Sequence, residues 1–294
     1  MGYEVVGLDS FDDFYDPSIK ETNLDGVRDH AAFTLVRCDI RDSTALEALP
    51  NGIDHVIHLA ARAGVRPSIE DPVLYSDVNL MGTSLLLAWS ARRRVSSLLF
   101  ASSSSVYGNN TKVPFAEIDP VDHPISPYAA TKKAGELLCH AHAYLTGTTV
   151  ACLRFFTVYG PRQRPDLAIH KFSKILRAGG RIPMYGDGST SRDYTYIADT
   201  VAGVVKALEW AAKRDGGFDI FNLGNRRTVT LSEMIRTIGE EMGVEPQIES
   251  MPMQPGDVEQ TYADIDHARE VLGYEPSTDF RDGVRRFLDW LGDG

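Results

Sequence analysis

The sequence is poor in cysteine and has no long apolar run. Its three cysteines, Cys38, Cys139 and Cys152, are odd in number and lie apart in apolar segments, which predicts reduced, buried thiols and excludes a disulfide framework. No apolar run is long enough to span a bilayer and no segment has the pattern of a signal peptide, so we expect a cytoplasmic protein. The eight histidines form no cluster with the spacing of metal ligands, and no metal site is predicted.

Positive charge is also scarce. The 30 lysines and arginines are outnumbered by 41 acidic residues, which gives a formal net charge of −11. A surface of this sign does not favour a nucleic acid or a membrane as partner, and an anionic substrate would have to be held by particular arginines. With 294 residues, 43% of them hydrophobic, the chain can build a large core.

The segment from Tyr128 to Lys132 carries the most informative chemistry. The two side chains are four residues apart and therefore fall on one face of a helix. An ammonium beside a tyrosine favours the phenolate, which makes the tyrosine a usable base near neutral pH. This spacing alone is common on helix surfaces. Here, however, the preceding apolar residues 97–101 indicate a buried strand, and the serines at 102–105 would lie at its carboxyl end, where open α/β sheets bind ligands.

Strands and helices are expected to alternate along the first half of the chain. The strands are predicted at residues 3–8, 33–37, 55–59, 98–101 and 149–155, and the helices at 18–28, 43–49, 71–94 and 128–145. This alternation predicts an α/β fold with a doubly wound parallel sheet. After Pro161 the regular alternation of strands and helices ends. Helices are predicted at 197–212, 231–242 and 280–291, and a strand at 218–223. We expect a sheet domain at 1–165 and a smaller α/β substrate lobe at 166–294, with 197–223 returning to the main sheet.

Several longer motifs resemble the extended short-chain dehydrogenase/reductase superfamily. They are VVGLDSFDDFYDPSIK, CDIRD, VIHLAARAGVR, FASSSSVYG, SPYAATKKAGE, LRFFTVYGPRQRPD, SRDYTYIAD, FNLGN and MQPGDVEQTYADI. Within that superfamily the sequence is similar to the NAD-dependent epimerase/dehydratase family, and most of all to UDP-glucuronate 4-epimerases. The resemblance runs nearly end to end. It implies a Rossmann-like domain, a bound NAD, a UDP-sugar substrate and a homodimer.

One departure from this family is large. The family's fold starts with a strand, a glycine-rich turn and a helix, which together hold the cofactor pyrophosphate. This sequence goes from Gly2 directly into a strand that matches the family's second strand, so roughly 20–30 residues of a βαβ unit are missing by comparison. A start codon placed too late, a truncated chain and a diverged protein without the cofactor are three open explanations. We expect the strands on either side of the missing one to lack a shared partner, and the printed chain to be less stable and to bind NAD weakly.

The resemblance also implies positions that contact the cofactor. The carboxylate of Asp9 would accept hydrogen bonds from the adenosine ribose, which favours NAD over NADP. A turn cap at Asp9, tight packing at the small residues and an ordinary buried amide at Asn79 are the simpler alternatives. The implied cofactor-binding residues are Asp9, Ser10, Asp39, Ile40, Leu59, Ala60, Ala61, Asn79, Tyr128, Lys132 and Phe155.

The same resemblance assigns catalytic roles. Ser103 and Tyr128 would share the sugar 4-hydroxyl, Ser105 would supply a neighbouring hydroxyl, and Lys132 would bind the nicotinamide ribose while lowering the pKa of Tyr128. Relatives that dehydrate sugars carry an Asp-Glu pair at the positions of Ser104 and Ser105, and relatives that decarboxylate carry a glutamate at the second. Both residues are serine here, which favours plain epimerisation.

Arginines are the expected anchors for an anionic nucleotide sugar, because the guanidinium fork matches phosphate and carboxylate geometry. Arg192 would contact the diphosphate, Thr157 and Arg164 the uronate carboxylate, and Arg66 would close over the sugar, although any one arginine could be a surface ion-pair partner. The implied substrate-binding residues are Arg66, Ser104, Thr157, Arg164, Arg192 and Asp257.

The leading hypothesis is interconversion of UDP-glucuronate and UDP-galacturonate at C4 through a 4-keto intermediate and transient NADH. A UDP-glucose or UDP-N-acetylglucosamine 4-epimerase and a catalytically silent family member are the alternatives. The resemblance also implies dimerisation through the two long helices. The apolar residues that would form that face, or else belong to the core, are Leu85, Leu86, Trp89, Leu137, Leu138 and Tyr144.

Overall fold

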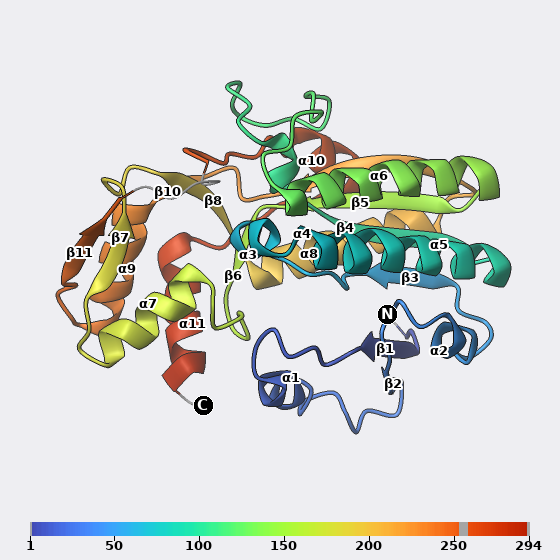
Figure 1. Cartoon of the computed structure of the whole chain (residues 1–294), viewed down its shortest axis with the longest axis horizontal. Coiled ribbons are helices and arrows are strands. Elements are labelled where there is room, and N and C mark those ends of the chain that lie inside the picture. Colours follow the sequence, from blue (N-terminus) through green and yellow to red (C-terminus); the bar gives the residue numbers. More distant parts are fainter. Residues whose placement is uncertain (1, 253–257, 293–294) are drawn as a thin grey trace.

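The computed structural model describes residues 2–252 and 258–292. Four parallel strands form its main sheet (Figure 1). Across the sheet they are β3 (His55–His58), β4 (Ser97–Ser103), β5 (Thr149–Phe155) and β9 (Gly217–Leu223). The first six residues of both central strands, β4 and β5, are buried, as the apolar runs predicted. The parallel α/β sheet predicted from the sequence is therefore confirmed, and β9 lies beside β5 in it.

Helices cover both faces of this sheet. On one face lie α5 (Gly82–Arg93) and α6 (Pro127–Thr146), and on the other α8 (Ile197–Ala212) and α10 (Asp266–Leu272) (Figure 1). Alternate residues of β4 belong to two hydrophobic cores, one on each face of the sheet. Leu98 and Phe100 pack with the first pair of helices, and Leu99 packs with the second. All three cysteines are buried and free, as expected.

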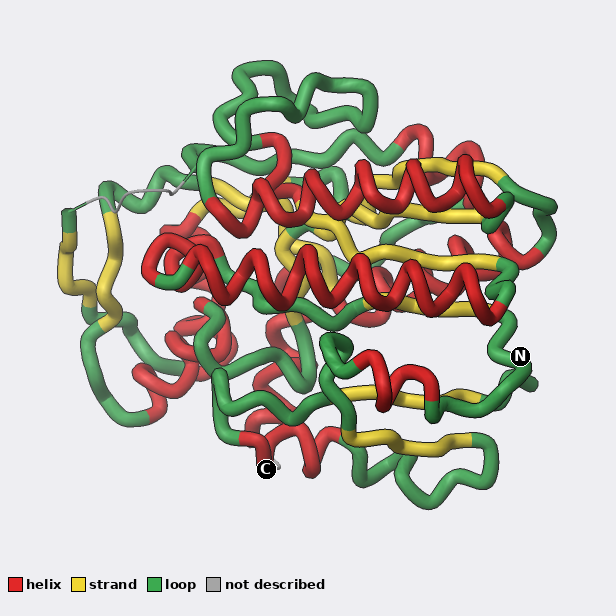
Figure 2. Tube along the Cα trace, turned by 45° about the vertical axis from the view of Figure 1, so that its right-hand side comes forward, coloured by secondary structure: helices red, strands yellow, loops and turns green. Residues whose placement is uncertain are grey.

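A second, two-stranded sheet stands apart from the main one. In it β1 (Val5–Asp9) pairs in parallel with β2 (Phe33–Arg37), next to α1 (Pro17–Asn23) and α2 (Ser43–Glu47). Figure 2 shows this pair beside the main sheet, and no ladder joins β1 to β3 within the described residues. Val5 is 49% exposed and Ile57 of β3 is 41% exposed. The expectation that these two strands would lack a shared partner is confirmed.

Two predicted helices differ from the structure. The long helix expected over 71–94 is divided into α4 (Pro72–Ser76), a π-helical turn η1 (Asp77–Met81) and α5. Such π turns are frequent at functional sites, and the hydrophobic period of the sequence does not reveal them.

The helix expected over 18–28 is shorter and begins earlier. It starts at Pro17 because the Asp16 carboxylate, and not Ser18, caps it by accepting the backbone N–H of Ser18. It ends at Asn23, and the chain then continues in turns that include Gly26.

The expected C-terminal lobe combines short strands with helices, and one of its strands, β6 (Thr157–Tyr159), precedes the expected boundary at residue 165. Three of the strands form one sheet in the order β10 (Thr228–Thr230), β8 (Ser191–Tyr196) and β6, and two more, β7 (Ile182–Tyr185) and β11 (Ile248–Met251), form another. Its helices are α7 (Ala168–Arg177), α9 (Leu231–Met242) and α11 (Phe280–Gly292). The bounds predicted for α8 and α9 are confirmed, and that for α11 is off by one residue. The short strands and the helices α3 (Val65–Glu70), α7 and α10 were not predicted from the sequence. Within the described residues, no helix has the length and apolar character needed to cross a bilayer.

Candidate active site

Helix α6 holds Tyr128 in its first turn. The helix begins after Ser126, whose hydroxyl accepts the backbone N–H of Ala129 at 3.1 Å. The backbone N–H of Tyr128 donates to the hydroxyl of Ser68 on α3 at 3.1 Å. The ring of Tyr75 on α4 meets the Tyr128 ring edge-on, with centroids 6.3 Å apart. Tyr128 is thus positioned by three helices, and neither Ser68 nor Tyr75 was identified from the sequence.

The same helix packs closely on the central strand. Gly135 of α6 faces the ring of Phe100 on β4, and a Cβ at this position would collide with that ring. One turn beyond Lys132, the buried carboxylate of Glu136 accepts from Arg154 Nε of β5 at 2.8 Å and from the Ser102 hydroxyl at 2.6 Å. A buried pair of this kind fixes the register of the elements that it joins. The helix that carries Tyr128 is therefore locked to the strand that carries the serines.

The serine run lies at the carboxyl end of β4. Ser103 ends the strand, and a 3₁₀ turn, η2 (Ser104–Tyr107), follows it. The Ser103 hydroxyl accepts the backbone N–H of Ser105 at 3.2 Å and the Ser105 hydroxyl at 2.8 Å. Ser103 also hydrogen-bonds the phenol of Tyr128. The structure therefore brings together the two serines and the tyrosine that the sequence singled out.

Lys132 lies beside Tyr128 but bonds elsewhere. Its Nζ donates to the carbonyl of Ala101 at 2.7 Å and is 5.8 Å from the centroid of the Tyr128 ring. The residue is only 4% exposed, and this burial lowers its pKa to about 8.

The expected effect of Lys132 on the pKa of Tyr128 is not met in this structure. Tyr128 keeps part of its surface accessible, yet the protein atoms crowded around it desolvate the phenol and raise its pKa. The hydrogen bond with Ser103 and the charge of Arg164 act in the opposite direction but do not overcome the burial. The physical reason is that the ammonium is directed at the Ala101 carbonyl and does not bond the phenol oxygen.

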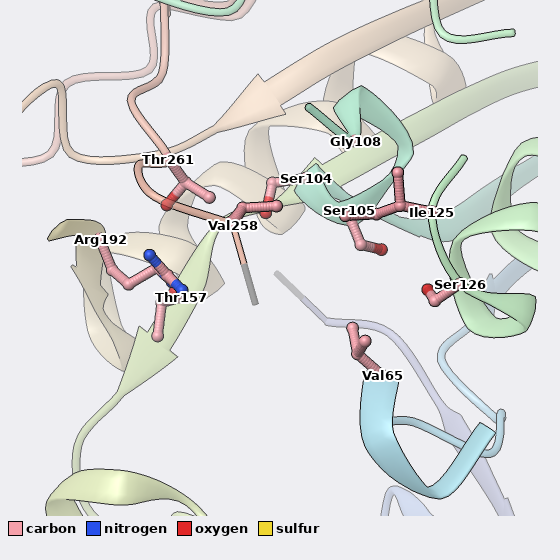
Figure 3. A pocket seen from close by; sticks show the side chains of 10 residues that line it. All are labelled: Val65, Ser104, Ser105, Gly108, Ile125, Ser126, Thr157, Arg192, Val258 and Thr261. Carbon is pink, nitrogen blue, oxygen red and sulfur yellow. The ribbon is translucent and has the colours of Figure 1, made fainter. Parts of the chain in front are cut away.

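A pocket of about 190 Å³ opens next to these serines (Figure 3). Ser104 and Ser105 contribute hydroxyls from the main domain, while Thr157 of β6 and Arg192 of β8 face the same space from the lobe. Its lining residues are Val65, Ser104, Ser105, Gly108, Ile125, Ser126, Thr157, Arg192, Val258 and Thr261. The pocket therefore combines small hydroxyl groups with a guanidinium, a set suited to a polar, anionic ligand.

The other predicted substrate residues lie outside this lining. Arg164 makes a bidentate ion pair with Asp166, from Nε at 3.0 Å and from Nη2 at 2.8 Å, and its charge acts on Tyr128. The guanidinium of Arg66 on α3 lies over the ring of Tyr185 on β7, 5.2 Å from its centroid, and so spans from the main domain to the lobe. Asp257 falls outside the described residues.

The acidic residues predicted to contact adenosine end two neighbouring strands. Asp9 Oδ1 at the end of β1 accepts from the Phe11 backbone N–H and from Lys20 Nζ, each at 2.7 Å. Asp39, which follows β2, is engaged on both oxygens by Arg41, whose hydrogen bonds lower the pKa of the carboxyl. Asp9 is therefore the more available of the two to a ligand.

Asn79 clamps the loop that follows β3. Its amide donates to the Arg62 carbonyl at 3.0 Å and accepts the Arg62 N–H at 2.8 Å, and it also donates to the Thr131 hydroxyl of α6 at 3.0 Å. It thus holds loop backbone near the site, one of the two roles left open by the sequence. Of the remaining cofactor candidates, Ser10, Leu59 and Ala60 are exposed, Ala61 and Phe155 are half-buried, and Ile40 is buried.

The donor set fits a nicotinamide dinucleotide at its two ribose ends. The ammonium of Lys132 has three N–H donors. Among the described residues, only the Ala101 carbonyl is seen to accept one of them, which leaves donors for ribose hydroxyls. Asp9 offers a carboxylate at the end of β1. The loop at 10–16 that follows β1 contains no glycine, so a glycine-rich pyrophosphate turn is not found there. Nor do the described residues contain a group of His, Cys, Asp or Glu able to hold a metal ion.

Comparisons with known proteins agree with this geometry. UDP-glucuronate 4-epimerase 4 of Arabidopsis thaliana is 40% identical over 305 residues, covering 98% of this chain and 70% of that protein. The crystal structure of UDP-glucuronic acid 4-epimerase from Bacillus cereus, with UDP-glucuronic acid and NAD, superposes with a TM-score of 0.91 at 34% identity, covering 99% of this chain and 91% of that one. A dTDP-glucose 4,6-dehydratase from Streptomyces venezuelae, with NAD bound, gives a TM-score of 0.92 at 27% identity, covering 100% and 89%. The sequence model of the NAD dependent epimerase/dehydratase family matches residues 1–224, and the chain belongs to this family of enzymes.

Proposed function

We propose that this protein is a nucleotide-sugar 4-epimerase that interconverts UDP-glucuronate and UDP-galacturonate. The observation that carries the proposal is the composition of the site around Tyr128. Ser103 bonds the phenol and Ser105 bonds Ser103, while Ser104 and Arg192 line the adjacent pocket and the charge of Arg164 acts on the phenol. The similarity to the plant and Bacillus cereus uronate epimerases supports this substrate class.

The residues divide the chemistry between them. A bound NAD would supply the hydride chemistry at sugar C4. Tyr128 accepts the proton of the 4-hydroxyl in its phenolate form and gives that proton back at the end of the cycle. Because burial in this structure raises the pKa of the phenol, the phenolate is the minor form there at neutral pH. Ser103, hydrogen-bonded to Tyr128, orients the same sugar oxygen, and Ser105 in turn orients Ser103. Proximity of these groups to the reacting oxygen supplies a large part of the rate acceleration.

The absence of carboxylates from the serine segment argues against elimination or decarboxylation. Positions 102–105 are all serine, so an acid-base pair of the kind that dehydratases need is not found at this strand end. The carboxylate of Glu136, the acidic side chain bonded to Ser102, is buried against Arg154 and committed to that ion pair. The fold alone would not decide this, because the dehydratase from Streptomyces venezuelae has the same architecture.

The direct test is to incubate the purified protein and NAD with UDP-glucuronate and to follow the products by NMR. The proposal predicts UDP-galacturonate and an equilibrium approached from either sugar. Formation of a UDP-pentose, or turnover of UDP-glucose alone, would contradict it.

The variant Arg164→Ala distinguishes a uronate 4-epimerase from a neutral-sugar 4-epimerase that acts on UDP-glucose or UDP-N-acetylglucosamine. We expect the variant to lose about 100-fold in kcat/KM for UDP-glucuronate, because a charge-assisted bond to the substrate carboxylate is worth about 2–3 kcal/mol. Turnover of UDP-glucose should change little. As a matched control, Arg162→Ala removes an exposed arginine of the same loop and should leave both substrates unaffected. Equal losses on both sugars in Arg164→Ala would favour the neutral-sugar alternative.

We also propose a homodimer formed through α5 and α6. On α6, Leu137 is 60% exposed and Tyr144 is 85% exposed, whereas Leu86 and Trp89 of α5 belong to the core. Exposed large apolar side chains on α6, a long helix that packs beside α5, suit a helical interface. The double variant Leu137→Glu, Tyr144→Glu is expected to elute as a monomer in size-exclusion chromatography with light scattering, where the wild type elutes as a dimer. A monomeric wild type, or a dimeric variant, would contradict this.

A further inference from the structure

An aromatic side chain far from the motifs contacts two arginines near the site. The guanidinium carbons of Arg62 and Arg164 lie 5.4 Å and 5.3 Å from the ring centroid of Phe14. Phe14 belongs to the loop after β1, Arg62 to the loop after β3, and Arg164 to the loop after β6. The ring therefore sits where three loops converge, and cation–π attraction ties it to two of them.

Phe14 is itself held in place. One oxygen of Asp12 accepts the backbone N–H of Phe14 at 2.9 Å, and the other accepts Arg62 Nη2, also at 2.9 Å. The backbone of Arg62 is in turn clamped by Asn79. The position of the ring is thus determined by the main domain and not by the loop that carries Arg164.

The geometry of Arg164 leaves one edge of its guanidinium for a ligand. Asp166 takes the side formed by Nε and Nη2, and the ring of Phe14 contacts the group as well. A guanidinium has five N–H donors in a rigid fork, so the Nη1 edge keeps the capacity to bind a second carboxylate. The charge of this group already acts on Tyr128 and Tyr75, which places it beside the reacting region.

We propose that Phe14 is a positioning residue for substrate specificity: its ring, anchored through Asp12 and Arg62, holds Arg164 so that the free edge of the guanidinium receives the carboxylate of a uronate sugar. This inference rests on the proposed function. It assigns a role to a side chain 150 residues from the arginine that it positions. Phe14 touches neither sugar nor cofactor in this role and acts only through Arg164.

The test compares affinities for a charged and a neutral sugar in the NAD-loaded protein. Dissociation constants for UDP-glucuronate and UDP-glucose are measured by calorimetry for the wild type, Phe14→Leu and Phe14→Trp. We expect Phe14→Leu to reduce the preference for UDP-glucuronate about three- to fivefold, which is the effect of one cation–π contact. Phe14→Trp keeps a ring and should retain the preference. Phe14→Met serves as a second ring-free variant if leucine impairs folding.

Tyr15→Leu is the matched control, because Tyr15 is an aromatic residue of the same loop that contacts Lys20. Its preference ratio should equal that of the wild type. In addition, Phe14→Leu should have no further effect on the ratio in an Arg164→Ala background. If Arg164→Ala abolishes the preference but Phe14→Leu preserves it, the positioning role is wrong and the proposed function stands. A wild type without any preference for UDP-glucuronate overturns both.

Discussion

Replacing Tyr128 with phenylalanine is expected to lower kcat about 1,000-fold with little effect on folding. The variant loses the group that is proposed to exchange the proton of the sugar 4-hydroxyl, and general acid–base groups contribute about 10²–10⁴-fold. The ring would still meet Tyr75, and the backbone N–H would still donate to Ser68. The lost hydrogen bond to Ser103 should reduce the unfolding free energy by about 1 kcal/mol. Steady-state kinetics and a thermal melt check the two halves of this result.

Tyr75→Phe is the matched control for this experiment. Tyr75 is a neighbouring tyrosine whose hydroxyl donates to the Ala63 carbonyl at 3.0 Å, and its ring packs on Tyr128. The variant removes the hydroxyl of a more deeply buried neighbouring tyrosine that has no proposed part in the reaction, so kcat should fall by less than about tenfold. An equally large loss in both variants would show that the site responds to any disturbance of this tyrosine pair, and would contradict a special role for Tyr128.

Lys132→Met is expected to stabilise the protein at pH 7 while nearly abolishing activity. Burial lowers the pKa of Lys132 from 10.5 to about 8, so the charged form is disfavoured in the folded state by about 3 kcal/mol. Methionine fills the same space without a charge. Loss of the bond to the Ala101 carbonyl offsets part of the gain, which leaves an expected increase of about 1–2 kcal/mol in unfolding free energy.

The pH dependence of the stability gain in Lys132→Met shows whether burial of the Lys132 charge causes it. At pH 7 Lys132 is charged in both folded and unfolded chains, and the full burial penalty applies. Between about pH 8 and 10.5 the folded protein has released a proton that the unfolded chain still holds, so wild-type stability rises through this window. The advantage of Lys132→Met should therefore shrink as the pH increases, which urea titrations at about pH 7 and pH 9.5 would measure. Lys133→Met, at a more exposed position with its Nζ 3.6 Å from Glu136, should show no such gain. A destabilised Lys132→Met variant at pH 7, or a pH-independent difference, would contradict the burial argument.

The reaction centre was largely predictable because its parts are local. The helical spacing of Tyr128 and Lys132, and the serines that follow a buried strand, depend on neighbours within a few residues. The strand predicted at 149–155 and the helices predicted at 197–212 and 231–242 match the structure for the same reason.

Positions set by distant contacts were not predictable. The short strands of the lobe are defined by their partners, as in the pairing of Thr157 on β6 with Tyr194 on β8, and three-residue strands carry little periodic signal. Ser68 and Tyr75 support Tyr128 from helices about 50–60 residues earlier in the chain, and no motif marks them. The same holds for the contact between Phe14 and Arg164.

The sequence by itself determined the α/β architecture, the tyrosine, lysine and serines that are proposed to react, and the lack of acidic residues in the serine segment. Only the tertiary structure decided the pKa values of these groups and the atoms with which they form hydrogen bonds. The pKa of Tyr128 is raised and that of Lys132 lowered because burial outweighs their neighbours, and the ammonium is directed at the Ala101 carbonyl. Desolvation depends on every atom packed around a group, including atoms from distant parts of the chain. The spacing of residues within a motif therefore cannot predict it.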